Sequence, residues 1–301
     1  MTDTKYTMKL RKSSKVENIV PIILFVIASI SVVTSIGIVL TLVVDASRFF
    51  AEVSIAEVFG TKLEPLKKDP SFGFLPLITG TIVTSLIAML VAAPLGITSA
   101  IFLSEFMSSK MRRIIKPIIE VLAGIPTIVY GFFAYNTVTP LLMNIFPELG
   151  AKNALSPGIV MGIMILPIVT SLSEDAMSSV PDYIRKGAYG LGSTKLEVAT
   201  KVIVPSAISG IVAAFVLAIS RAIGETMIVT IASGSSKQFT LDIMQPMQTM
   251  TAYIVEFTSG DAGSGTIGYY SLYAVGLMLF IFTMLTNLLA RYITKKYRRE
   301  Y

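Results

Sequence analysis

The chain has 301 residues, of which 53% are hydrophobic and only 15% are charged, and its mean hydropathy is +0.73. Soluble domains carry about 25% charged residues, so this composition indicates a membrane protein. The absence of Cys excludes disulfides, thiol catalysis and thiolate metal sites. The absence of His removes the commonest general base and metal ligand. These absences weigh against an enzyme, and no metal site is expected.

Six apolar stretches reach the ~20 residues that a bilayer requires. They cover residues 19–44, 75–103, 114–138, 154–172, 207–231 and 269–289. We expect each to be a helix, because lipid leaves the backbone no other way to satisfy its hydrogen bonds short of a closed barrel. Pro94, Pro126 and Pro167 fall within spans and are expected to kink or interrupt them.

The first apolar stretch follows a basic leader, as the core of a cleaved signal peptide would. Its apolar run is longer than the roughly 7–15 residues of a signal-peptide core, and no clear cleavage motif follows it. We therefore expect a retained first helix.

The distribution of Lys and Arg predicts the orientation of the spans. One set of loops, which includes both termini, holds 18 of the 25 basic residues, whereas the opposite set holds 6. By the positive-inside rule both termini lie in the cytoplasm, so the basic tail is an orientation signal and no nucleic-acid partner is expected. The predicted organisation is a cytoplasmic tail (1–18), a first span (19–44), an extracytoplasmic loop (45–74), a core of five spans (75–290) and a basic cytoplasmic tail (291–301).

Three connecting loops are long. The outer loops 45–74 and 232–268 are partly apolar, which is typical of short amphipathic pieces lying at a membrane interface. The cytoplasmic loop 173–205 mixes eight charges with Gly and Ala, which favours a folded element that meets another protein. No G-x-x-x-x-G-K-[ST] nucleotide loop occurs, so any ATP that drives this protein must bind to another chain.

Arg221 and Glu225 lie inside the otherwise apolar stretch 207–231. One charge at the bilayer centre costs about 2.5–3.5 kcal/mol on insertion scales, so such charges are either paired or used. At i, i+4 the two side chains are expected to share a helix face. Two interpretations stay open: a structural ion pair, and a site for an anionic cargo.

The cytoplasmic loop carries the most informative spacing. Lys186-Gly187-Ala188 precedes Gly192 by three residues, and nine more separate Gly192 from Val202-Ile203-Val204-Pro205. This spacing resembles the coupling motif E-A-A-x3-G-x9-I-x-L-P of ABC importer permeases. In that family the motif forms two short helices that sit in a cleft of the ATPase subunit. Lys186 stands where the family has Glu, and a generic helix–Gly–helix loop is the alternative.

The motif makes local predictions. Gly192 is expected to supply the turn between the two short helices with a positive φ. Thr194 or Ser193 should cap the second helix, with Glu197 completing a capping box. Pro205 suits the start of the following span.

Further runs in the same order extend the resemblance over about residues 70–295. They are Leu77-Ile78-Thr79-Gly80-Thr81, Ala93-Pro94-Leu95-Gly96, Glu120 to Gly131, Leu166-Pro167, Ser171 to Ala176, and Arg221 to Met227. Together they resemble the permease subunits of the bacterial and archaeal phosphate ABC importer, and the PstC-type more than the PstA-type. The resemblance implies an all-α membrane protein with six transmembrane helices of the MetI-like type.

The resemblance also implies partners. They are a homologous PstA-type permease, two ATPase subunits that bind ATP and Mg, an extracytoplasmic phosphate-binding protein and membrane lipids. The chain itself is expected to hold no cofactor and to act in the cytoplasmic membrane as a transport subunit rather than as an enzyme.

The resemblance implies three groups of site residues. Those of the substrate path are Arg221, Gly224, Glu225 and Thr226, and the Arg fork suits phosphate. Those of ATPase coupling are Lys186, Gly187, Ala188, Leu191, Gly192 and Pro205. Those of structure or gating are Glu120, Gly124, Pro126, Glu174 and Asp175. A permease for sulfate or molybdate, an ion-coupled carrier without an ATPase, and a scaffold that signals phosphate status are the alternatives.

Overall fold

The computed structural model describes residues 15–261, 263 and 265–297. Within them the regular structure is helical except for one two-stranded antiparallel hairpin, in which Leu63 pairs with Phe72 and Glu64 with Ser71. Most of the predicted tail 1–18 and the end of the basic tail (298–301) lie outside the described residues.

The elements have the following bounds. The longer helices are α1 (Lys15–Glu52), α3 (Leu75–Ile101), α4 (Ser109–Val121), α7 (Leu155–Ser178), α11 (Ile208–Ile223) and α14 (Ile267–Tyr297). The shorter helices are α2 (Ile55–Val58), α5 (Thr127–Phe133), α6 (Thr139–Met143), α8 (Asp182–Gly190), α9 (Lys195–Glu197), α10 (Val204–Ser206), α12 (Met227–Ala232) and α13 (Met250–Glu256). The strands are β1 (Leu63–Glu64) and β2 (Ser71–Phe72). The 3₁₀ segment is η2 (Leu122–Gly124), and the π-helical segments are η1 (Phe102–Phe106), η3 (Ala134–Val138), η4 (Val198–Ile203) and η5 (Phe257–Asp261).

Four helices, namely α1, α3, α7 and α14, are individually long and apolar enough to cross a membrane. Two bent helix pairs raise the number to six if each pair counts as one span. The first pair bends by 85° between residues 124 and 127, and the second by 72° next to Ala207. Four of the predicted spans are thus single helices in the described chain, whereas the predicted spans 114–138 and 207–231 are both divided between shorter helices. Pro126 lies at a break, whereas Pro94 and Pro167 lie inside continuous helices.

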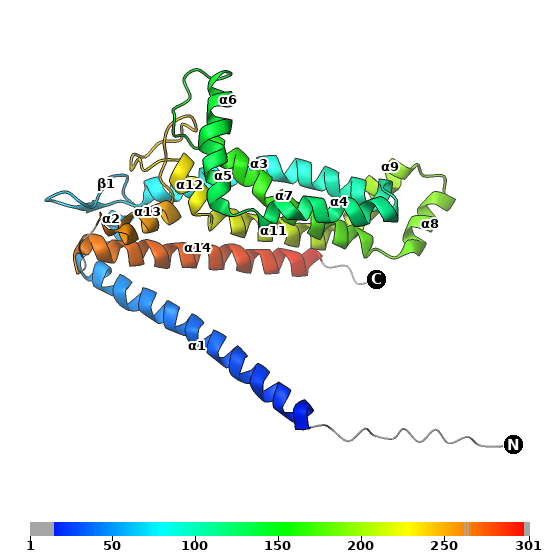
Figure 1. Ribbon diagram of the computed structural model, residues 1–301, viewed down its shortest axis with the longest axis horizontal. Coiled ribbons are helices and arrows are strands. Elements are labelled where there is room, and N and C mark those ends of the chain that lie inside the picture. The colour runs from blue at the N-terminus through cyan, green and yellow to red at the C-terminus, as the bar shows by residue number, and fades with distance from the viewer. Residues whose placement is uncertain (1–14, 262, 264, 298–301) are drawn as a thin grey trace.

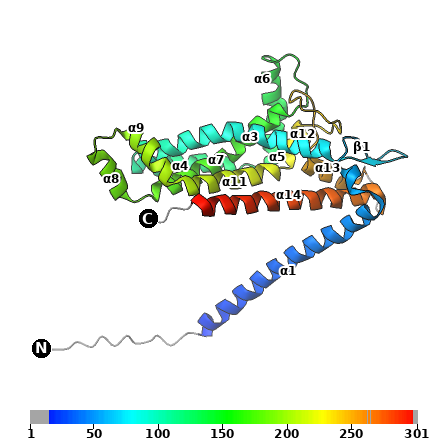
Figure 2. The ribbon, with the colours of Figure 1, turned by 180° about the vertical axis from the view of Figure 1, so that it is seen from behind.

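The body of the molecule is a bundle in which α3, α7, α11 and α14 run side by side (Figures 1 and 2). Helices α3 and α7 pack most closely, because small residues let their backbones approach. A Cβ added at Gly158 or Gly162 of α7 would come within 2.7 Å of Ile87 or Val91 of α3. The contact between these two helices therefore depends on glycine.

An apolar lobe forms at one end of the bundle, where the hairpin, α2 and α13 gather (Figure 1). Its fully buried aromatic residues are Phe49, Phe72, Phe74, Tyr253 and Phe257. Part of the apolar content of loops 45–74 and 232–268 is thus buried in this lobe, whereas Ile55, Phe59 and Leu241 of the same loops are exposed. Helix α1 accordingly continues to Glu52, beyond the predicted boundary at residue 44, so that Phe49 reaches the lobe.

Helix α1 diverges from the bundle beyond its contact with α14, in both views (Figures 1 and 2). Its apolar side chains from Ile19 to Val44 are mostly exposed. The start of α1, the last turns of α14 and the pair α8–α9 all lie toward one end of the molecule, opposite the hairpin.

Candidate functional site

The predicted fifth span is interrupted at Gly224-Glu225-Thr226. Helix α11 ends at Ile223, and α12 begins at Met227. This corrects the expectation that Arg221 and Glu225 share a helix face, because Glu225 lies beyond the end of the helix that carries Arg221. Gly224, which lacks a Cβ and is a poor helix former, is the C-cap of α11.

The carboxylate of Glu225 binds to the backbone at this interruption and does not pair with Arg221. Its side chain is only 6% exposed, and its Oε1 accepts the backbone N–H groups of Met227 (3.1 Å) and Ile228 (3.4 Å) at the start of α12. Its own backbone carbonyl accepts the hydroxyl of Thr251 at 2.7 Å. A carboxylate is well placed here because the first N–H groups of a helix have no partner within the helix.

Arg221 is an exposed residue in the last turn of α11. Its side chain makes no hydrogen bond or ion pair with any residue that the structure describes. The structural ion pair with Glu225 is therefore not formed in this structure. An unpaired guanidinium at this position is free to meet an anion that comes from outside the chain.

Two predicted residues border the break. Thr226 donates its hydroxyl to the carbonyl of Gly224 at 3.2 Å and is the N-cap of α12. Helix α5 lies against α12 through Gly131, where an added Cβ would come within 2.8 Å of Ile231 Cδ1. The break is thus supported on a second side by α5.

The bend between α4 and α5 contains three of the predicted structural residues. Glu120 accepts the hydroxyl of Ser171 on α7 at 2.9 Å, which identifies the expected partner on a neighbouring helix. Gly124 ends η2, and Pro126 is the N-cap of α5. A Cβ at Gly124 would meet no atom within 4 Å, so this glycine serves the bend and makes no close helix contact.

Loop 173–205 folds as two short helical arms, as the motif predicted. Helix α8 is the first arm, and α9, η4 and α10 together form the second. Gly192 lies between the arms with φ +86°, and Thr194 and Glu197 form the predicted capping box. Pro205 lies in the first turn of α10, just before the chain bends into α11.

The arms expose an apolar tip. Leu191 is 89% exposed, Leu196 is 61% exposed, and Tyr183 and Tyr189 are also exposed. Lys186 lies beside them on the exposed part of α8, whereas Ala188 packs against the core formed by Met177, Val198 and Ile203. Exposed apolar side chains at a tip are typical of a surface that another protein covers.

The first arm is fixed to the bundle by Arg185, which sequence reasoning missed. Its guanidinium forms an ion pair with Glu105 of η1 at 3.1 Å, and the two side chains are 16% and 4% exposed. It also donates to the backbone carbonyls of Val180 (2.5 Å) and Met177 (2.7 Å). A single side chain thus connects α8 with the C-terminal ends of α3 and α7.

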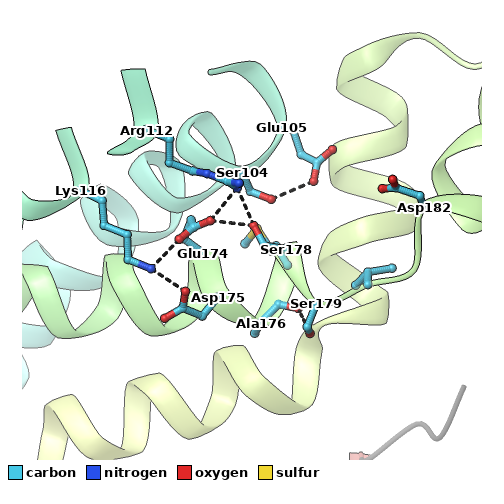
Figure 3. Close-up of polar contacts among 12 residues, drawn as sticks. Ser104, Glu105, Arg112, Lys116, Glu174, Asp175, Ala176, Ser178, Ser179 and Asp182 are labelled. Carbon is cyan, nitrogen blue, oxygen red and sulfur yellow. Dashed lines mark hydrogen bonds and ion pairs between the residues drawn. The ribbon is translucent and has the colours of Figure 1, made fainter. Parts of the chain in front are cut away.

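A second polar cluster lies beside this anchor (Figure 3). Glu174, only 2% exposed, accepts Arg112 at 3.0 Å, Lys116 at 2.7 Å and the hydroxyl of Ser178 at 2.6 Å. Asp175 pairs with the same Lys116 at 2.5 Å. The cluster joins α4 to the end of α7 that leads into α8. This geometry suits the expected role of Glu174 and Asp175 in supporting the arms.

Comparison with known proteins decides the family. The family described as binding-protein-dependent transport system inner membrane component matches residues 92–299. The chain belongs to this family. As an inner membrane component it is a multi-pass transport subunit without a cofactor of its own and not an enzyme.

Two curated relatives share much of this inner membrane component. It is 34% identical to the probable ABC transporter permease protein YqgH of Bacillus subtilis, over 89% of this chain and 88% of the relative. It is 39% identical to the phosphate transport system permease protein PstC of Mesorhizobium japonicum, over 74% of this chain and 73% of the relative. The predicted resemblance to permeases of ABC importers is thereby confirmed.

A solved structure shows the shared fold of this inner membrane component. A chain of the MetNI methionine ABC transporter in inward facing conformations superposes with a TM-score of 0.57 at 15% identity, covering 75% of this chain and 95% of that one. The predicted MetI-like architecture is confirmed by this likeness.

Proposed function

We propose that this chain is a permease subunit of an ATP-driven importer of inorganic phosphate. The observation that carries the proposal is the exposed, unpaired Arg221 at the end of α11, in a chain that is 39% identical to a phosphate transport permease. A guanidinium stays charged at any physiological pH and offers a planar donor fork that matches the oxygens of phosphate. Glu225, whose carboxylate accepts N–H groups of α12, leaves that fork available.

The break at Gly224 supports the same function. Irregular backbone at membrane depth is tolerated where it is buried in protein or lines a cavity, and interrupted helices are common at transport sites. Gly224 and Thr226 are the exposed and half-buried residues of this break. We assign them, with Arg221 and Glu225, to the substrate path.

The arms of loop 173–205 support a partner that binds ATP. Their exposed tip, with Lys186, Gly187 and Leu191, offers a docking surface for an ATPase subunit, and Arg185 connects this surface to the bundle. We propose a complex of this chain, a PstA-type permease, two ATPase subunits that bind ATP and Mg, and an extracytoplasmic phosphate-binding protein. In this complex both termini of the chain lie in the cytoplasm, on the side of the arms.

The test is ATP-driven uptake of labelled phosphate by the complete transporter reconstituted in vesicles. Arg221→Gln should abolish uptake, because it removes the charge while it keeps a polar side chain of similar length. Co-purification of the ATPase subunits should be unchanged. Lys110→Gln, which removes an exposed cation on α4, is the matched control and should transport normally. Uptake by Arg221→Gln near the unmutated rate would refute the assignment.

Competition separates phosphate from other oxyanions. Excess sulfate or molybdate should leave phosphate uptake unchanged, and stronger inhibition by either than by unlabelled phosphate would assign the permease to that anion. An ion-coupled carrier is distinguished by its energy source. Uptake that is driven by an ion gradient and persists in vesicles without ATP would favour the carrier.

A further inference from the structure

Helices α11 and α14 border an open cavity of about 630 Å³ along their seam. The side of α11 contributes Ala213 and Leu217, and the side of α14 contributes Asn287, Arg291 and Lys295. The lining is therefore apolar on the side of α11 and mostly polar on the side of α14, where Ala290 is the one apolar residue. None of the residues that line this cavity is acidic.

The polar lining belongs to one face of α14. Asn287, Arg291, Thr294 and Lys295 are spaced by three and four residues, so they lie on one side of the helix. The neighbouring side carries Leu285, Leu288, Leu289 and Tyr292, all of them exposed. Three of the four polar lining residues lie in the predicted tail 291–301, so the cavity has a polar and basic wall at the end of α14.

A hydrogen bond sets the level of the cavity relative to Arg221. The hydroxyl of Ser220 donates to Asn287 Oδ1 at 3.1 Å. Arg291 follows Asn287 by four residues, which is about 6 Å further along α14 toward the arms. On α11, Arg221 continues the line of Ala213 and Leu217 by one more turn. The cavity therefore lies directly on the cytoplasmic side of Arg221.

The two cations of the cavity have no counter-charge among the residues that the structure describes. Neither Arg291 nor Lys295 makes an ion pair or hydrogen bond with a residue that the structure describes. At i, i+4 on one helix face they repel each other. The positive-inside rule explains why basic residues occur at this end of α14, but it does not place two of them in one cavity without an acid.

We propose that Arg291 and Lys295 bind a phosphate group in this cavity, with Asn287 and Thr294 available as further hydrogen-bonding groups. The group comes either from free phosphate or from the headgroup of an anionic phospholipid whose chain lies on Ala213 and Leu217. The site goes beyond the proposed function. The site depends on the proposed function only if the ligand is free phosphate. In that case phosphate reaches this cavity after it leaves Arg221.

The experiment measures binding directly and does not depend on transport. Inorganic phosphate is titrated into the purified complete transporter in detergent, and broadening of the phosphorus-31 resonance is followed. In parallel, native mass spectrometry measures retention of phosphatidylglycerol against phosphatidylcholine. The variants are Arg291→Gln, Lys295→Gln, the double variant, and Lys110→Gln as the control that removes an exposed cation outside the cavity.

For free phosphate, the double variant should raise the half-saturating phosphate concentration at least about tenfold, because each lost charge-assisted hydrogen bond weakens binding by about that factor. For a headgroup, it should instead lose the preference for phosphatidylglycerol by a similar factor. Lys110→Gln should change neither. If the double variant changes neither quantity, the proposal is overturned. Each titration is repeated with Arg221→Gln. Phosphate binding that depends on Arg291 and Lys295 but not on Arg221 would show that the Arg221 assignment is wrong while this site exists.

Discussion

Arg185 is the residue whose loss should affect the largest part of the coupling apparatus. It is bound to Glu105 and to two backbone carbonyls where the first arm meets α3 and α7. Removal of one partner from a buried ion pair costs about 3–5 kcal/mol, because the other charge stays buried without a partner. We therefore expect Arg185→Gln to lower the thermal midpoint of the purified complex and to raise the number of ATP molecules hydrolysed per phosphate imported.

The matched control is Lys201→Gln in the second arm. Lys201 pairs with Glu197 at 3.1 Å, but both side chains are exposed, so this substitution should cost at most about 1 kcal/mol. Equal thermal midpoints and equal ATP use in the two variants would argue that the Arg185 anchor does not couple the arm to the bundle.

Contacts between residues close in the sequence were predictable, whereas contacts between distant residues were not. Gly192, Thr194 and Glu197 were predicted correctly because a turn and a capping box depend on residues a few positions apart. The partner of Arg185 lies 80 positions away, so no local pattern could identify it. Glu225 was misplaced because helical spacing assumes a continuous helix, whereas Gly224 and its own capping bonds end that helix.

At the scale of elements, the pairing of α3 with α7 depends on missing side chains. An added Cβ at Gly162 would lie 2.7 Å from Val91 Cβ and 2.8 Å from the carbonyl oxygen of Ala88. We expect Gly162→Ala to destabilise the protein by about 1–3 kcal/mol through overpacking, measured as a lower thermal midpoint in detergent. Gly37→Ala on α1, where an added Cβ meets nothing within 4 Å, should leave the midpoint unchanged or raise it slightly.

The second arm has its own dependence on pH. Hydrogen bonds from Thr194 and the nearby charge of Lys201 lower the pKa of Glu197 to about 2. Because this folded-state pKa is below the usual value of 4.5, the carboxylate stabilises the arm fully above pH 4.5. That contribution is lost as the pH falls from 4.5 toward 2.

The titration of the Glu197 carboxyl group, followed by carbon-13 NMR in the selectively labelled protein, should have its midpoint well below 4.5. Thr194→Val removes the hydroxyl that caps the arm and should move the midpoint upward. A midpoint at the ordinary glutamate value in the unmutated protein would show that the capping box is open in solution.

Four of the spans were predictable from the sequence as single helices, but the shape of the other two was not. Apolar length determines that a segment can cross lipid, and this holds for α1, α3, α7 and α14 taken singly. Bends of 85° and 72° depend on how neighbouring helices cover the freed backbone groups. The hydroxyl of Tyr130, which donates to the carbonyl of Leu122 across the first bend at 2.7 Å, is one such contact.

At the scale of the whole molecule, the proposed orientation can be tested cleanly because the chain has no Cys. Lys110 on α4 and Lys68 near the hairpin are both exposed, and we place them on opposite sides of the membrane. In intact cells a membrane-impermeant maleimide should label Lys68→Cys but not Lys110→Cys. After the cells are opened, both variants should react. Labelling of Lys110→Cys in intact cells would reverse the proposed orientation.

The divergent first helix has a consequence for how the protein is made. Four of its hydroxyl groups are satisfied within the helix: those of Ser29, Thr34, Ser35 and Thr41 donate to carbonyls four residues earlier, at 2.8–2.9 Å. Such a helix is complete as soon as it has been synthesised, so it can enter lipid before the rest of the chain exists. Helix α7 is mostly buried and needs its neighbours. Biogenesis therefore begins with an independent anchor, and the bundle assembles from later segments that depend on one another.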